Sequence, residues 1–138
     1  MGPVPMSIFR VDPSRGEPLF QQLVDAVKRA VATGALVPGD RLPSVRELAR
    51  DLVINPNTIA KAFRELEGEG VTVSRPGAGT FVSERRPTMS REERRRRLQE
   101  GFEGVLTEAV PWGATDEETR KAFEDAMARL RGRRGGGA

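Results

Sequence analysis

The side chains best suited to chemistry in this sequence are short polar groups and cations at the start of a predicted helix. Asn55, Asn57 and Thr58 supply amide and hydroxyl groups, and Lys61 and Arg64 follow on the same exposed side. Amides and hydroxyls can approach base edges in the major groove of DNA, while cations bind the flanking phosphates. The positive end of the helix dipole and its free N–H groups also favour an anion. The spacing therefore predicts a surface that reads duplex DNA.

Further candidates lie on either side of this helix. Arg46 and Arg50 belong to a preceding predicted helix, from which they can reach the DNA backbone or the groove. The alternative interpretations are an ordinary capped surface helix and, around Arg75 and Gly77, a plain hairpin turn. The predicted DNA-binding residues are Arg41, Ser44, Arg46, Arg50, Asn55, Asn57, Thr58, Lys61, Arg64, Arg75 and Gly77.

The composition argues against most enzyme classes. The chain has no Cys, His or Tyr, which excludes thiol catalysis, Cys/His zinc sites and Ser-His-Asp arrangements. The stretch Gly77–Thr80 is glycine-rich but lacks the Gly-Lys-Ser/Thr ending of a phosphate-binding loop. We expect a protein that is not an enzyme and that needs neither a metal nor a cofactor.

Length and charge fit one small domain with a short addition. The chain has 138 residues and a net charge of +3, which suits a polyanionic partner but is too small to identify one. The first residues lack the pattern of a secretory signal, and no apolar run is long enough to span a membrane. We therefore expect a cytoplasmic protein without a membrane partner.

A helix-turn-helix is predicted to position the polar cluster. Ser44–Glu47 is a capping-box pattern that starts a short helix ending near Leu52. Asn55–Pro56 opens the next helix, since Asn caps helix N-termini and Pro presets φ for the first turn. That helix is expected to end near Glu69. Two helices thus meet across a tight turn.

An amphipathic helix precedes this pair and a hairpin follows it. The first helix is predicted from Pro18 to Gly34, and strands are predicted over Val71–Ser74 and Thr80–Ser83 around a glycine-containing turn. The fold expected is a mainly α member of the α+β class, a winged helix-turn-helix. Its first helix should bury an apolar face made of Leu19, Phe20, Leu23, Val24, Val27 and Val31.

These motifs carry a family resemblance. Pro38–Ala49, Asn55–Thr58 and Gly77–Val82 together resemble the GntR family of regulators, and the resemblance covers about Glu17 to Val82. It implies that Arg46 and the start of the recognition helix contact an operator, with Gly77 approaching the minor groove. Many relatives have an Arg where this chain has Ala60, which leaves guanine recognition to Lys61 or Arg64.

The C-terminal part is predicted to form two more helices. Ser90–Glu93 and Thr115–Glu118 are capping-box patterns, and the first helix is expected to end near Pro111. The length of this tail and the Asn-Pro-Asn-Thr start of the recognition helix resemble the YtrA-like subfamily, whose members are dimers. The residues expected to hold a homodimer are Leu98, Phe102, Val105, Leu106, Trp112, Phe123, Met127 and Leu130.

The expected organisation has four parts. They are an extended arm over residues 1–16, a DNA-binding domain over 17–86, a two-helix dimerisation extension over 87–131 and a disordered Gly/Arg tail over 132–138. The expected function is that of a transcription regulator, in the first place a repressor, that binds an inverted-repeat operator in double-stranded DNA as a homodimer. The alternatives are a switch that responds to a small-molecule effector, whose existence the sequence leaves open, and a protein-interaction module that uses the tail.

Overall fold

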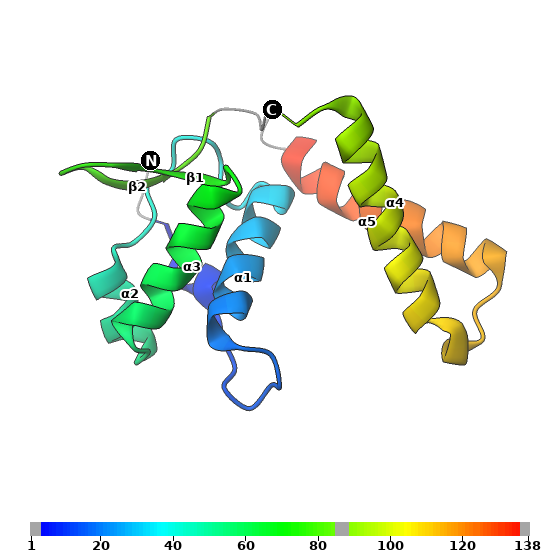
Figure 1. Ribbon diagram of the computed structural model, residues 1–138, viewed down its shortest axis with the longest axis horizontal. Helices are drawn as coiled ribbons and strands as arrows, with labels where there is room; N and C mark the ends of the chain where they lie inside the picture. The colour runs from blue at the N-terminus through cyan, green and yellow to red at the C-terminus, as the bar shows by residue number, and fades with distance from the viewer. Residues whose placement is uncertain (1–3, 85–88, 136–138) are drawn as a thin grey trace. The chain divides into compact units, whose positions relative to one another are not determined.

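The computed structural model describes residues 4–84 and 89–135, with side chains as far as Leu130. Two compact units divide the described chain, one built on residues up to 86 together with the end of the last helix from Leu130, and the other on residues 87–129. The first contains three α-helices and a two-stranded sheet, and the second contains most of a further pair of α-helices (Figure 1). No helix among the described residues is long and apolar enough to cross a membrane.

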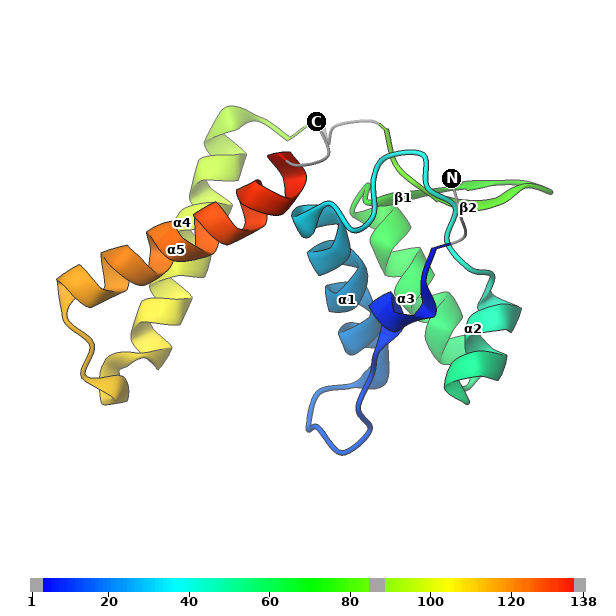
Figure 2. The same cartoon turned by 180° about the vertical axis from the view of Figure 1, so that it is seen from behind.

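The N-terminal segment differs from the extended arm expected over residues 1–16. It forms a 3-10 helix, η1 (Met6–Phe9), and the Phe9 side chain is buried in the core. η1 packs on the first α-helix (Figure 2). Gln22 fixes the chain that follows, because its amide accepts from the Asp12 N–H and donates to the carbonyls of Asp12 and Glu17. This segment therefore belongs to the first unit, where it covers apolar surface.

Helix α1 (Leu19–Thr33) forms where the apolar periodicity predicts it. Leu23, Val24 and Val27 are buried, whereas Leu19, Phe20 and Val31 are only partly buried at the edge of the core. Gly34 ends the helix with φ 81°, in the left-handed region that glycine enters without steric cost.

Helices α2 (Val45–Leu52) and α3 (Pro56–Gly68) form the predicted helix-turn-helix. The Ser44 hydroxyl caps α2 by accepting from the Glu47 N–H, and the Asn55 side chain caps α3 by accepting from the Asn57 N–H. α3 lies beside both α1 and α2. Its buried side chains, Ile59, Ala62 and Leu66, have no exposed surface and join Leu48 in the core.

The wing is an antiparallel hairpin of β1 (Thr72–Arg75) and β2 (Gly79–Val82). Both strands are shifted by one residue toward the turn from their predicted bounds, because the turn is tighter than expected. The Ala78 N–H donates to the Arg75 carbonyl, and Gly77 adopts φ 76° at the tip. The loop before α2 pairs with β2 through N–H groups of Gly39 and Leu42, so β2 lies between β1 and this loop.

The second unit contains α4 (Arg91–Glu108), a 3-10 turn η2 (Val110–Trp112) and, as far as Arg129, α5 (Asp116–Gly135). The Ser90 and Thr115 hydroxyls cap the two helices as expected. Thr115 and Glu118 form the complete capping box, in which the Thr115 N–H also donates to the Glu118 carboxylate. α5 continues to Gly135, so the prediction of disorder from residue 132 is wrong as far as Gly135. Residues 136–138 lie outside the described part.

Replacing Thr72 by Val should stabilise the first unit. The Thr72 side chain is buried, and its hydroxyl has no hydrogen-bond partner among the described residues. A buried hydroxyl without a partner loses its hydration, whereas a methyl group of the same shape does not. We expect Thr72→Val to raise the free energy of unfolding by about 1 kcal/mol, measured by urea denaturation. Thr80→Val, at a half-buried position of β2, should change it by less than about 0.5 kcal/mol. A Thr72→Val protein no more stable than the parent would contradict this account.

Candidate nucleic-acid interface

The exposed face of α3 brings together three of the predicted site residues. Asn57, Lys61 and Arg64 are all exposed and follow one another at steps of four and three residues, which places them on one side of the helix. Ala60, half-buried, lies at the border of this face. Thr58 is also half-buried, and the Asn55 side-chain oxygen is occupied by its capping bond, so the amide NH₂ is the part of Asn55 left to a ligand.

Lys61 is held by a contact that the sequence analysis missed. Its Nζ lies 3.8 Å from the centre of the Phe20 ring, a cation–π geometry that joins α3 to α1. The contact explains why Phe20 remains at the edge of the core. It restricts the long side chain while leaving it exposed, so the ammonium has a preferred position beside α3.

Helix α2 contributes charges of different character. Arg46 is exposed in its first turn, beside the Ser44 cap. Arg50 is exposed in the last turn, but its Nε donates to the neighbouring Asp51 carboxylate at 3.0 Å. Because that pair is exposed, it screens Arg50 without fixing it strongly. Ser44 serves the structure as a cap, which still leaves its hydroxyl hydrogen for donation to a phosphate.

Two arginines pack on the wing. The Arg75 guanidinium lies over the Phe81 ring, 4.8 Å from its centre. Arg41 pairs by its backbone with Phe81, and its side chain passes so close to Gly79 that a Cβ there would meet Arg41 Nε at 2.8 Å. Glycine at position 79 therefore makes room for Arg41. Gly77, by contrast, has open space around it at the tip.

Glu67 is a positioning residue that the sequence analysis did not find. It lies on α3, and its carboxylate accepts from both the N–H and the hydroxyl of Ser74 on β1, at 3.0 and 3.3 Å. The Ser74 N–H would otherwise be an unpaired donor on the open edge of β1. One side chain thus ties the wing to the helix that carries Asn57 and Lys61. A Glu followed seven residues later by Ser gives no sequence signal of such a contact.

The polar cluster contains no evident metal site. Among the described residues no group of three or more acidic side chains is arranged to hold a metal ion. The groups that converge on α3 and the wing are amides, hydroxyls and cations, which bind nucleic-acid bases and phosphates.

Removing the Glu67 carboxylate should loosen the wing. In Glu67→Ala the Ser74 N–H loses its acceptor, and we expect its amide hydrogen to exchange about ten times faster, as measured by NMR. Glu65→Ala is the matched control, since Glu65 is exposed on the same helix. Equal exchange of the Ser74 amide in both variants would show that Glu67 does not hold the wing.

Comparisons with known proteins agree with this geometry. The family model of bacterial regulatory proteins of the gntR family matches residues 19–82. The HTH-type transcriptional repressor YtrA of Bacillus subtilis (strain 168) is 33% identical over 125 residues, which cover 91% of this chain and 96% of that protein.

Two solved structures also superpose on this chain. The transcriptional antiterminator of Listeria monocytogenes EGD-e superposes with a TM-score of 0.75 at 27% identity, over 88% of this chain and 91% of that one. YtrA from Sulfolobus acidocaldarius, a GntR-family transcription factor, superposes with a TM-score of 0.59 at 31% identity, over 72% of this chain and 98% of that one. With its capped helix pair and glycine-tipped wing, the chain belongs to the GntR family of DNA-binding transcriptional regulators and is YtrA-like.

Proposed function

We propose that this protein is a transcriptional repressor that binds an inverted-repeat operator as a homodimer. The observation that carries the proposal is the exposed face of α3, where Asn57, Lys61 and Arg64 lie together beside a wing that carries Arg75. In helix-turn-helix proteins the second helix of the motif enters the major groove with its N-terminal residues toward the bases. The repressor name of the Bacillus relative supports the sign of regulation.

The wing and α2 fit the same mode of binding. With α3 in the major groove, Arg75 of β1 can neutralise phosphates, and Arg46 of α2 can reach a phosphate or a base in the groove. Gly77 at the wing tip has no Cβ and no close neighbour. A backbone of this kind can enter a narrow minor groove, which supports the predicted role of Gly77.

The dimer is supported by apolar surface that one protomer leaves uncovered. No side chain of α4 is buried. Among the predicted dimer residues Met127 is half-buried, and the others are exposed. The Phe102 and Phe123 rings meet edge to face with centres 5.3 Å apart, which links α4 to α5 but covers neither. The large apolar side chains left exposed on α4, η2 and α5 are Leu98, Phe102, Val105, Leu106, Val110, Trp112, Phe123 and Leu130.

Burial of these apolar side chains by a second copy would stabilise a dimer. Each Leu, Phe or Met side chain that moves from water to a buried position contributes roughly 1.5 to 3 kcal/mol. A surface with this many such side chains can hold two protomers together after the entropy of association is subtracted. A two-fold dimer presents two copies of α3, and a two-fold protein matches an inverted repeat.

A chain that ends at Arg86 should separate DNA binding from dimerisation. The first unit has its own core, so the fragment should fold. We expect it to be a monomer in sedimentation experiments and to bind the inverted repeat about a hundred times more weakly than the full chain, because the second half-site loses its tethered recognition helix. Both proteins should bind an isolated half-site with similar affinity. A fragment that is dimeric at micromolar concentration and retains full operator affinity would contradict the proposed dimer surface.

Removing Arg46 or Lys61 should weaken operator binding. We expect Arg46→Ala to weaken binding by about 1 to 3 kcal/mol if Arg46 contacts a base. Lys61→Ala should have the same effect if Lys61 contacts a base. If Lys61 contacts a phosphate instead, its removal should lower by about one the salt slope, which is the slope of the logarithm of affinity against the logarithm of salt concentration. Affinity is measured by titration of labelled operator over a range of salt concentrations. Arg29→Ala, at an exposed position of α1, is the control. Unchanged affinity and salt slope in both variants would overturn the assigned DNA surface.

A further inference from the structure

The charges of the second unit are segregated along the chain. Residues 91–97 contain five arginines and two glutamates, whereas residues 98–118 contain six carboxylates and no Lys or Arg. The first stretch begins α4, and the second runs from its middle through the connection into the first turn of α5. The beginning of α4 is thus basic. The opposite end of the helix pair, where the connection joins α4 to α5, is acidic.

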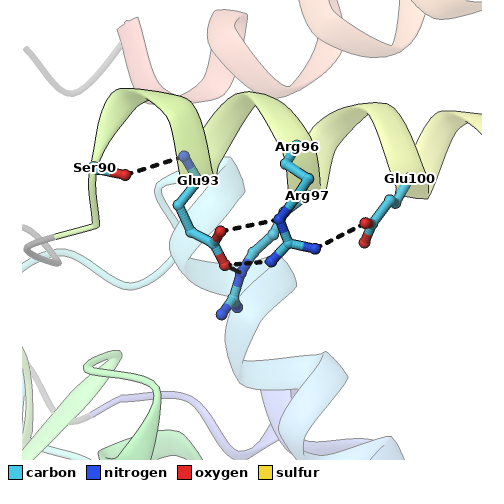
Figure 3. A network of polar contacts seen from close by, with 5 residues as sticks. All are labelled: Ser90, Glu93, Arg96, Arg97 and Glu100. Atoms are coloured by element: carbon cyan, nitrogen blue, oxygen red, sulfur yellow. Dashed lines mark hydrogen bonds and ion pairs between the residues drawn. The ribbon is translucent and has the colours of Figure 1, made fainter.

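The charged side chains on one side of α4 pair with one another. Glu93 accepts from Arg96 and Arg97, and Arg96 also donates to Glu100 (Figure 3). These hydrogen bonds, of which those from Arg96 have the larger effect and that from Arg97 the smaller, lower the pKa of the Glu93 carboxyl to about 2. The network lies within one helix, with Glu93 half-buried and both arginines exposed, so its charges are satisfied without a partner.

The other side of α4 carries cations that lack such partners. Arg91, Arg94 and Arg95 line one surface groove together with Leu98 and Phe102, which means that they extend the apolar stripe toward the start of the helix. Among the described residues none of these three arginines forms an ion pair, although Arg94 donates to the Met89 carbonyl. The apolar stripe and the unpaired arginines therefore form one continuous surface.

The matching carboxylate lies at the start of α5. Asp116 precedes Phe123 by seven residues, or two helical turns, so it extends the apolar stripe of α5 as the arginines extend that of α4. Within one protomer the two charges are far apart, because the part of α4 after Arg95 is about 20 Å long and α5 begins only after the connection. In a second copy packed in the opposite direction, the two ends can meet.

We propose that Arg91, Arg94 and Arg95 of one protomer bind Asp116, at the acidic start of α5, in a second copy of this chain. This inference rests on the homodimer proposed above and adds how the two helix pairs are oriented. Opposite charges at the two ends of one apolar surface favour the antiparallel arrangement and oppose the parallel one, in which like charges would meet. In a two-fold dimer each contact occurs twice, so modest ion pairs add up.

A charge exchange between two full-length variants tests the orientation. Arg91→Glu with Arg95→Glu makes the basic end acidic, and Asp116→Lys with Glu117→Lys makes the acidic end basic. Glu118 is left unchanged because it completes the cap of α5. Lys121→Glu with Arg129→Glu is the control, since both residues are exposed on α5 away from Phe123 and the change in net charge equals that of the arginine variant.

We expect each reversed variant alone to dimerise about ten times more weakly than the parent in low salt, measured by sedimentation equilibrium. An equimolar mixture should regain dimerisation to within about threefold of the parent, and native mass spectrometry should show mainly heterodimer. The control should dimerise like the parent.

Three results would overturn the proposal. They are parental dimerisation by the reversed variants, a mixture that gains nothing, and an arginine variant that dimerises normally but binds DNA with a reduced salt slope, since the arginines would then face phosphates. The first two leave the dimer itself intact if the parent is dimeric and the fragment ending at Arg86 is not. Failure of the orientation is thus distinguishable from failure of the proposed function.

Discussion

Burial of one side of α3 is the constraint on which the DNA-binding surface depends. Ile59, Ala62 and Leu66 are without exposed surface, on a helix that packs against α1 and α2. An α-helix is rigid, so fixing these three side chains also fixes the direction of every other position. Asn57, Lys61 and Arg64 face solvent because the core holds the opposite side. The polar face is thus a consequence of packing as much as of its own residues.

The wing is anchored at its base by the buried Thr72 and Val82 side chains, and its outer part is held mainly by polar contacts. A two-stranded hairpin alone is marginally stable in water. Here the Glu67 carboxylate covers the outer edge of β1 at Ser74, and the loop before α2 pairs with β2 through backbone hydrogen bonds. The Arg41 side chain then fills the space that Gly79 leaves. Small changes at these few groups can move the wing relative to α3 without disturbing the core.

The helices of the second unit, unlike those of the first, do not depend on a buried core within one chain. Its helices are stabilised locally, by the Ser90 and Thr115 caps and by the ion pairs of Glu93, and not by burial. In proteins most of the stability of a helix comes from the packing of its apolar face. The apolar stripes that remain exposed therefore agree with the proposed dimer, in which the second copy would supply the missing core.

The sequence alone determined the order and kind of the elements, because the signals for them are local. Apolar periodicity predicted α1, α3 and α4, and Ser44, Asn55, Ser90 and Thr115 marked helix starts that the structure has at the same residues. Family motifs then added the regulator family. Only the tertiary structure decided what depends on contacts between distant residues. It placed Phe9 in the core, Lys61 over Phe20 and Glu67 against Ser74. Such contacts join segments that no local pattern relates. Lys61 and Glu67 favour a helix by their local preference whether or not these contacts form, so the sequence gives no sign of them.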